Sequence, residues 1–420
     1  MATMTIESYV EAVDSNEDLT IQYATIQNLF ESSSPKNQEK VQFPMSTCLF
    51  EDNLRRYRGT IIDNKTKKIV KEGSFFPYEF IEDEQEECKE KMAMLNHKLE
   101  DMDIQYSYEG TIIRIFYYKK WYISTHRKLD SGRSKWGSNN SFKYLFERGL
   151  NESYNMSLKD LFTQLNLRCE YTFMVMADEN TRFVCTSNHS KKVYLVGSND
   201  PDVINLKIDG LSKPHNIFNN LDDIFKFVKG MQYPFEQQGL LLVHKNGSQY
   251  RIISNEYAKL FKVRNNEPSI PYRYIQLKSQ NDHESIELLK KLFPLHIETF
   301  KTYDLYVSKL VDLVYQEYDK RKQRSVLPAD LTSMEQIDQR VYLFIKNKLL
   351  NRPTVTCEQI LQLLWCEEPS NLNHMIRMIK YKERQRLTIE LPTTAVCAPR
   401  KKKTKYTPIQ VDFSCRKRLF

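Results

Sequence analysis

The fold of this chain is decided by residues 105–136, which read QYSYEGTIIRIFYYKKWYISTHRKLDSGRSKW. After Gly110 the segment is rich in Ile, Phe, Tyr and Trp, and the run is broken at Lys119 and Lys120. β-Branched and aromatic residues suit a half-buried pleated surface, and a short polar break between two such runs is typical of a hairpin turn. We therefore expect two antiparallel strands joined at the lysine pair and followed by the basic segment HRKLDSGRSK.

Further segments stand in a recognisable order around this hairpin. Upstream, Arg58 and Gly59 open the run RGTII; downstream come EYTFMVM at residues 170–176, QGLLLV at 238–243 and GSQYRIISNEY at 247–257. Together with SYEG at residues 107–110, this order resembles the covalent nucleotidyltransferases, and most closely the RNA ligases that repair cleaved tRNA in bacteriophages. STHRKLDSGRSKW and KVRNNEPSIPYRYIQL resemble even more closely the RNA-ligase-like proteins of large cytoplasmic DNA viruses. An ordered set of segments is more specific than any one short motif.

The resemblance implies a nucleotide pocket that has lost its nucleophile. In that family the pattern is Lys-x-Asp/Glu-Gly, and the lysine amine attacks the α-phosphate of ATP. Here Ser107 stands at the position of the lysine, followed by Glu109 and Gly110. A serine hydroxyl would form a different bond and needs a general base, which no residue supplies at an obvious spacing. Because losing a covalent nucleophile costs many orders of magnitude in rate, lysine-dependent adenylation is not expected.

Other positions of the resemblance have also lost charge. Gln238 and Thr172 stand where the family has glutamates, and Ile253 stands where it has one of two closing lysines; Arg251 stands at the other. Such replacements keep the shape of a pocket and remove the groups that hold a metal ion. ATP and Mg²⁺ are therefore expected as cofactors only if the protein is active, and no other cofactor or metal site is expected.

The basic residues of these segments are candidates for phosphate contacts. We expect Arg58, Arg127, Lys128, Lys135 and Arg251 to contact a nucleotide or RNA, with Trp136 stacking on a base and Gly110 lining the pocket. Glu109 would hold the adjacent loop or a ribose. The alternatives are an ordinary strand-edge arginine at position 58, and a charged loop in which Trp136 fills the edge of a core.

Composition excludes several classes of protein. With 420 residues, 40% hydrophobic and 12% aromatic, the chain is long enough for two domains and is not broadly disordered. Its eight cysteines form no Cys-x-x-Cys pair and have no histidine at metal-ligand spacing, which predicts reduced thiols and no zinc site. There is no secretory signal and no apolar run of about 18 residues, so we expect a cytoplasmic protein without a membrane partner, in a viral factory or virion if it is viral.

The net charge of +8 is concentrated at the end of the chain, since residues 391–420 carry +7 of it. The rest of the chain is therefore nearly neutral. A general attraction to nucleic acid would reside in this tail, whereas the folded part could attract phosphate only through local patches.

Local patterns predict several further elements. The polar segments DNKTKK at residues 63–68 and Lys245-Asn246-Gly247 each separate two β-rich runs, which indicates hairpin turns. We expect residues 181–186 to continue the sheet, residues 32–40 to form a loop, and residues 21–30 to form a short helix or strand.

The pattern of apolar residues changes after Gln276. Apolar positions recur at three and four residues from Phe300 onward, and capping boxes at Thr332–Glu335 and Thr356–Gln359 start two further helices. We therefore expect an α+β chain: an antiparallel-sheet, RNA-ligase-like nucleotidyltransferase domain at residues 1–275, a helical domain at 276–392, and a basic tail at 393–420.

Three functions remain open at this level. The first is a degenerate RNA-ligase-like protein that binds RNA ends or nucleotide without lysine–adenylate chemistry. The second is an active ATP-dependent RNA ligase in which Lys119, Lys120 or Lys128 replaces the missing lysine. The third is a non-enzymatic virion or transcription-complex component that holds viral or transcription-complex proteins through its helical domain and basic tail.

Overall fold

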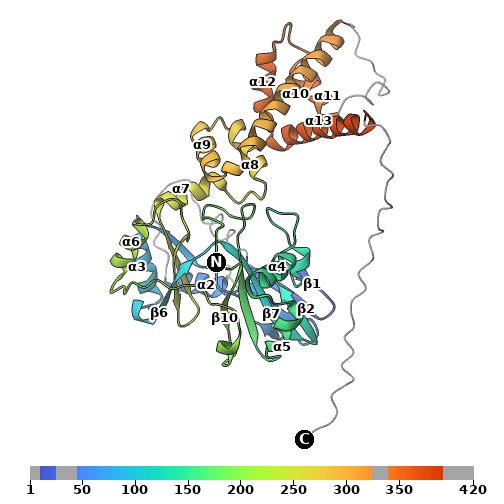
Figure 1. Ribbon diagram of the computed structural model, residues 1–420. Coiled ribbons are helices and arrows are strands. Elements are labelled where there is room, and N and C mark those ends of the chain that lie inside the picture. Colours follow the sequence, from blue (N-terminus) through green and yellow to red (C-terminus); the bar gives the residue numbers. More distant parts are fainter. Residues whose placement is uncertain (1–9, 25–44, 324–338, 391–420) are drawn as a thin grey trace, which may run out of the picture.

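The computed structural model describes residues 10–24, 45–323 and 339–390. Within them the chain forms three four-stranded sheets, followed by a helical region that projects from one end of the sheets (Figure 1). The expected α+β class is confirmed. The predicted loop at residues 32–40, the capping box at Thr332–Glu335 and the basic tail at 393–420 lie outside the described residues.

The first sheet is an antiparallel meander of consecutive strands: β1 (Val10–Ser15), β2 (Leu19–Ala24), β3 (Arg58–Asp63) and β4 (Ile69–Lys71). The predicted hairpin through the polar segment DNKTKK is the β3–β4 pair. Helix α2 (Met45–Arg55) leads into β3. Leu19, Ile21 and Ile61 are fully buried and form a core with Phe116 and Tyr122 of the next sheet, so the two sheets are held together by apolar contact.

The second sheet has the order β10-β9-β7-β8 and contains the predicted hairpin. Its strands are β7 (Gly110–Tyr118), β8 (Lys120–Ser124), β9 (Glu170–Met176) and β10 (Val193–Ser198). The turn between β7 and β8 is at Lys119, with φ +60°. The 3₁₀ turn η3 (Ser131–Arg133), α4 (Phe142–Tyr154) and α5 (Leu158–Gln164) follow β8, and residues of α4 and α5 pack on Ile113, Ile115 and Phe173. The predicted hairpin is therefore confirmed.

The third sheet is mixed, with the order β5-β12-β11-β6. Its strands are β5 (Tyr78–Ile81), β6 (Met102–Ser107), β11 (Gly239–His244) and β12 (Gln249–Ile253). The β5–β12 pair is parallel and the other two pairs are antiparallel. The prediction of Asn246-Gly247 as a hairpin turn is confirmed, with Gly247 at φ +92°. Helices α3 (Gln85–Met94) and α6 (Leu221–Lys229) cover one face; the 3₁₀ turns η2 (Leu99–Asp101) and η4 (Val203–Asn205) are connections.

Residues 105–136 do not form one unit, because the chain changes sheets between Ser107 and Gly110. Residues 102–107 pair with β11 in the third sheet, whereas β7 pairs with β8 and β9 in the second. The predicted continuation of the sheet at residues 181–186 is wrong. Those residues form a loop, because the backbone N–H groups of residues 183–185 donate to the carboxylate of Glu109 rather than to a strand.

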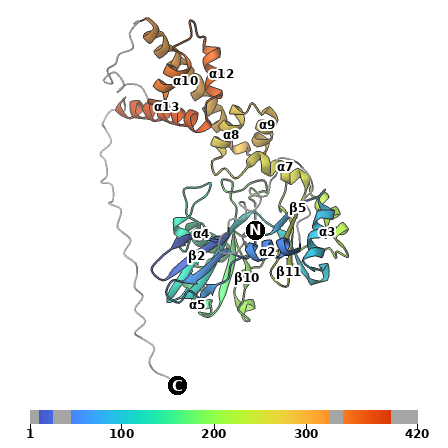
Figure 2. The ribbon, with the colours of Figure 1, turned by 180° about the vertical axis from the view of Figure 1, so that it is seen from behind.

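The helices that follow β12 begin with α7. The elements of this helical region are α7 (Asn255–Arg264), α8 (Ile270–Ser279), α9 (His283–Leu292), η5 (Pro294–His296), α10 (Ile297–Gln323), α11 (Gln339–Lys348), α12 (Cys357–Trp365) and α13 (Pro369–Glu390). Residues of α7, α8 and α9 share a core with Val184, Phe235 and Ile253 of the sheet region, and α7 lies at the junction in both views (Figures 1 and 2).

The remaining helices build a separate core from the apolar stripe that the sequence predicts. It includes Val307, Leu310 and Val314 of α10, all with at most 1% of their surface exposed, together with residues of α8, α11, α12 and α13. The capping box at Thr356–Gln359 starts α12 as predicted. None of the described helices is both long and apolar enough to cross a bilayer.

Candidate functional site

Two positions that the sequence singles out for lost catalytic groups are in direct contact. Ser107 is the last residue of β6, and Gln238 immediately precedes β11, the neighbouring strand. The Gln238 N–H donates to the Ser107 carbonyl at 2.7 Å, and the Ser107 hydroxyl donates to Gln238 Oε1 at 3.0 Å. The next residue, Gly239, allows β11 to lie close to β12: it has φ +152°, and a Cβ there would lie 2.1 Å from the Ile252 carbonyl oxygen.

The hydrogen bonds continue from Gln238 to a buried carboxylate. Gln238 Nε2 donates to the Tyr257 hydroxyl at 3.0 Å, and this hydroxyl donates to Glu109 Oε1 at 2.9 Å. Ser107, Glu109 and Tyr257 each have less than 5% of their surface exposed. Burial, and then the charge of Glu109, raises the pKa of Tyr257 well above its usual range, so the phenol keeps its proton. The partner of the Ser107 hydroxyl is therefore the side-chain amide of Gln238, and an amide is not a general base that could remove the hydroxyl proton.

Glu109 has a structural task in this arrangement. Its Oε2 accepts from the Phe183 N–H at 2.6 Å, and its Oε1 accepts from Val184 at 2.8 Å and Cys185 at 3.0 Å. With Tyr257 this makes four donors on a carboxylate that is 2% exposed. Of the two roles expected for Glu109, holding the adjacent loop is the one these contacts perform, and they use the oxygens that a ribose or a metal ion would need.

Three of the five predicted phosphate-contacting cations lie together. Arg58 opens β3, Arg127 lies in the turn after β8, and Arg251 lies in β12, yet Arg127 and Arg251 both help to lower the pKa of Arg58. Burial is the larger cause of that shift, and a hydrogen bond with Tyr23 opposes it. We call Arg58, Arg127 and Arg251 the arginine cluster.

Aromatic rings support the arginine cluster. The Arg127 guanidinium lies 4.3 Å from the centre of the Tyr23 ring, and that of Arg58 lies 4.8 Å from the Phe76 ring. Arg251 forms an ion pair with Glu79 at 3.1 Å. Among the described residues, the buried Nε atoms of Arg58 and Arg251 have no hydrogen-bond partner. The cluster therefore keeps donor capacity for an anion, since a guanidinium carries five N–H groups and does not lose its charge near neutral pH.

Arg251 of the arginine cluster and Ser107 lie on the same face of the third sheet. Ser107 pairs with Gly239, and Gly239 pairs with Ile253. Because side chains alternate along a strand, Arg251 projects on the same side as Ile253 and Ser107, opposite to Tyr250 and Ile252, which pack under α3 and α6. Arg251 also acts electrostatically on Tyr257. The polar contacts at Ser107 and the positive charge of the cluster thus form one candidate site.

The other predicted binding residues lie elsewhere. Lys128 forms an ion pair with Asp14 of β1 at 3.4 Å. Trp136 packs on the Phe183 ring at 4.7 Å and on the Arg264 guanidinium at 5.1 Å, and with Lys135 it lines a separate cavity beside α8. Gly110 serves packing between strands, since a Cβ there would lie 2.6 Å from the Val175 carbonyl oxygen.

The lysines considered as substitute nucleophiles are remote or paired. Strand β7 spans the nine residues Gly110–Tyr118, which places Lys119 and Lys120 roughly 30 Å along the strand from its Ser107 end. Lys119 also binds the Asp18 carboxylate, which raises the pKa of its amine. A protonated amine is not a nucleophile, so this shift argues further against Lys119, whereas for Lys120 the argument is its distance from Ser107.

Tyr257 and Arg114 are residues of the site that sequence reasoning did not assign. Ser254 caps α7 by accepting from the Tyr257 N–H, which puts Tyr257 in the first turn. Ser254 directly follows the β-rich run of β12, and a serine at such a position indicates the start of a helix, so the sequence contained a signal for α7. Arg114 is 2% exposed, forms an ion pair with Glu170, and donates to the carbonyls of Gly59 at 2.6 Å and of Glu72. It therefore fixes the backbone beside Arg58.

Comparison with known proteins gives a family. No family model matches the chain. It is 54% identical over 439 residues to a protein of Invertebrate iridescent virus 3 named "Immediate-early protein ICP-46 homolog", with 99% of each chain covered. A homologue of the same name in Invertebrate iridescent virus 6 is 30% identical over 62% of this chain and 63% of its own, and the Frog virus 3 protein "Immediate-early protein ICP-46" is 25% identical over 47% and 55%. These names state no reaction and no ligand. The chain is a viral protein and belongs to the immediate-early protein ICP-46 family.

Proposed function

We propose that this protein binds RNA ends or nucleotide at a degenerate, RNA-ligase-like adenylation site and does not form a lysine–adenylate. The observation that carries the proposal is the hydrogen bond between Ser107 and Gln238, 3.0 Å long. The two positions were singled out separately, 131 residues apart, as lacking a lysine and a glutamate. Their contact supports the proposal, because a neutral hydroxyl–amide pair then stands where the resemblance implies a pair of charged groups.

The chemistry of the pair argues against covalent catalysis. The Ser107 hydroxyl donates its proton to an amide oxygen, and its hydrogen bonds lead to the Glu109 carboxylate through Gln238 and Tyr257. Mg²⁺ prefers carboxylate oxygens, but Glu109 is occupied by its four donors, and Gln238 and Thr172 are neutral. Among the described residues no group of three or more His, Cys, Asp or Glu side chains is arranged to hold a metal ion. These residues do not fit a metal-assisted adenylation.

The arginine cluster supports the binding part of the proposal. Burial, and then the charges of Arg251 and Arg127, lowers the pKa of Arg58. A buried cation beside other cations is costly unless an anion compensates. A phosphate group is such an anion, and it accepts the forked hydrogen bonds that arginine donates. RNA ends and nucleotides both carry phosphate beside a planar base.

Binding is tested with a short 5′-phosphorylated RNA labelled with a fluorophore, by anisotropy at several salt concentrations. Replacing Arg58 and Arg127 by Ala should weaken binding by about tenfold or more and reduce the salt slope by about 0.7 for each lost phosphate contact. Arg168→Ala, which removes an exposed arginine before β9, is the matched control. Unchanged affinity and slope in the double variant would remove the cluster from the binding site.

The missing chemistry is tested by incubation with labelled ATP and magnesium ions, with an active RNA ligase alongside. No protein-linked label is expected. An adenylate that survives base and is cleaved by acid would contradict the proposal and favour an active ligase. Absence of RNA and nucleotide binding together with absence of label would favour the non-enzymatic component of a virion or transcription complex.

A further inference from the structure

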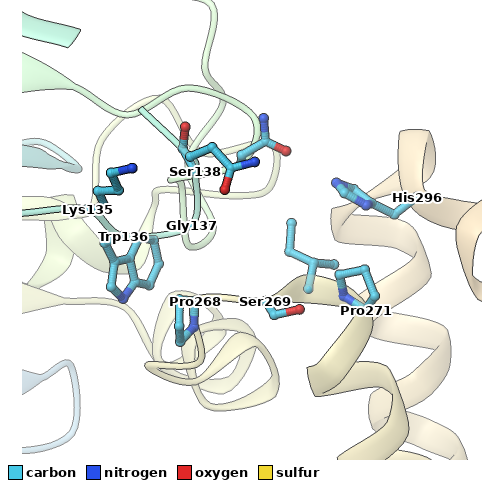
Figure 3. A pocket seen from close by; sticks show the side chains of 11 residues that line it. Lys135, Trp136, Gly137, Ser138, Pro268, Ser269, Pro271 and His296 are labelled. Carbon is cyan, nitrogen blue, oxygen red and sulfur yellow. The ribbon is translucent and has the colours of Figure 1, made fainter. Parts of the chain in front are cut away.

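A cavity of about 400 Å³ lies between the sheet region and the helical region. On the sheet side it is lined by Lys135, Trp136 and residues 137–139, and on the helical side by the start of α8 and His296 of η5. Figure 3 shows His296 reaching into this space from the helical side, opposite Ser138 and Lys135. The cavity is thus formed by two parts of the chain that are far apart in the sequence.

A second cavity, of about 640 Å³, lies within the helical region. It lies at α8, α10, α11 and α13 and is lined by Ser269, Tyr272, Tyr303, Arg340, Ser370, Asn373, His374 and Arg377. Both volumes fall in the range of ligand-binding pockets, which is roughly 300–1,000 Å³.

The two cavities meet at Ser269, which lines both and caps the N-terminus of α8. Among the residues that the structure describes, none that lines either cavity carries a carboxylate, although Asp and Glu make up 54 of the 420 residues of the chain. The first cavity is lined by Lys135 and His296. The second is lined by Arg340, Arg377 and His374. We call this pair of cavities the basic track. Positive charge without carboxylates is the arrangement that attracts phosphate.

Two further features of the second cavity suit a nucleotide. The Lys380 amine lies 3.7 Å from the centre of the Tyr303 ring. Lys380 therefore packs on one face of this ring and adds a cation to those of Arg340 and Arg377. Oδ1 of Asn373 is buried and has no hydrogen-bond partner among the described residues. A buried acceptor without a partner is costly, and the hydroxyl of a ribose or the amino group of a base would satisfy it.

We propose that the basic track binds a single RNA strand and carries it from the sheet region onto the helical region. The choice of RNA rests on the function proposed above, whereas the charge, the ring and the unpaired acceptor are independent of the arginine cluster. A single strand is inferred because each cavity has the volume for individual nucleotides, which can present their bases to rings and their phosphates to cations.

The test compares RNAs of two lengths, about 5 and about 20 nucleotides, since single-strand sites commonly cover about 4–16 nucleotides per module. Replacing both Arg340 and Arg377 by Ala should weaken binding of the long RNA about tenfold and reduce its salt slope by about 1.4, and should leave the short RNA unchanged. Lys301→Ala with Lys320→Ala, two exposed lysines of α10, is the matched control.

A second variant guards against a folding artefact, because Arg340 also donates to Ser370 and Asn371 of α13. Asn373→Asp keeps the size of the side chain and places a carboxylate in the cavity, and it should weaken binding of the long RNA selectively. If neither the arginine pair nor Asn373→Asp affects the long RNA while the arginine cluster variants weaken both RNAs, the basic track is wrong and the proposed function stands. If no variant of either set affects binding, both are wrong.

Discussion

The Tyr257 hydroxyl donates to the Glu109 carboxylate at 2.9 Å, and it joins the first turn of α7 to the residues at which the chain changes sheets. Through Tyr257 the carboxylate is linked to Gln238 and Ser107, and through its other bonds it fixes residues 183–185. One buried carboxylate thus holds two sheets and the first helix of the helical region in a single arrangement.

The first prediction concerns that hydroxyl. Tyr257→Phe should lower the free energy of unfolding by about 1–3 kcal/mol, because it removes a hydrogen bond to a buried charge and leaves the Gln238 amide without its acceptor. Urea denaturation gives the value. Tyr315→Phe, at an exposed tyrosine of α10, is the control and should change stability by less than about 0.5 kcal/mol. An equally small effect at position 257 would mean that the hydroxyl is not part of the network.

The second prediction concerns the coupling of Ser107 with Gln238. Ser107→Lys alone should destabilise the protein, because it places an ammonium group in a buried position that has only an amide as partner. Adding Gln238→Glu should recover part of the loss, with a coupling energy of about 1–3 kcal/mol in a double-mutant cycle. Gln237→Glu in place of Gln238→Glu is the matched control. Additive effects of the two changes would contradict the contact.

The sequence predicts local structure well where the signal is local. The lysine pair after the strand of Tyr117 and Tyr118 marks a turn, Asn246-Gly247 marks another, and Thr356 with Gln359 caps a helix; each was found where expected. Residues 181–186 were misread as a strand because their composition suits one. What decides their structure is a carboxylate 74 to 76 residues earlier in the chain, and no local pattern contains that information.

The candidate site shows the same division. Order along the chain was enough to single out Ser107, Gln238 and the arginine cluster, because each lies in a recognisable segment. It could not separate Lys128 from Arg127, although they are neighbours. In the folded chain Asp14 attracts the Lys128 amine, whereas Arg127 lies over Tyr23. The direction in which a side chain points at a turn depends on strands β1 and β2, of which sequence reasoning anticipated only a short helix or strand beginning at Ile21.

The third prediction concerns Arg114, which ties β7 to the first sheet. Arg114→Lys keeps the charge but cannot reach Glu170 and the carbonyls of Gly59 and Glu72 together, since an ammonium group lacks the planar fork of a guanidinium. We expect a loss of about 2–4 kcal/mol in the free energy of unfolding, measured by urea denaturation. Arg148→Lys, in an exposed pair with Glu152, should cost less than about 0.5 kcal/mol. Equal effects at the two positions would refute a special role for Arg114.

The last prediction uses His126, which lies beside the arginine cluster. Burial, and then the charges of Arg58, Arg127 and Arg114, lowers the pKa of His126 from 6.5 to about 3. At pH 7 the imidazole is neutral in the folded chain and mostly neutral in the unfolded chain. As the pH falls below 6.5, His126 becomes protonated in the unfolded chain but stays neutral in the folded chain. The wild-type protein therefore loses stability as the pH falls, until His126 is protonated in the folded chain as well at about pH 3.

His126→Phe keeps a ring against Tyr23 and removes the titration. The variant should therefore gain about 2–4 kcal/mol relative to the wild type between pH 7 and pH 3.5, with the difference in unfolding free energy read from urea curves at each pH. His283→Asn, at an exposed histidine, controls for the loss of a histidine elsewhere. The carboxylates that titrate in the same range cancel in the comparison, because both proteins contain them. If the difference in unfolding free energy between the two proteins stays constant with pH, His126 has the same pKa in the folded and the unfolded chain. In that case neither burial nor the arginine cluster lowers its pKa.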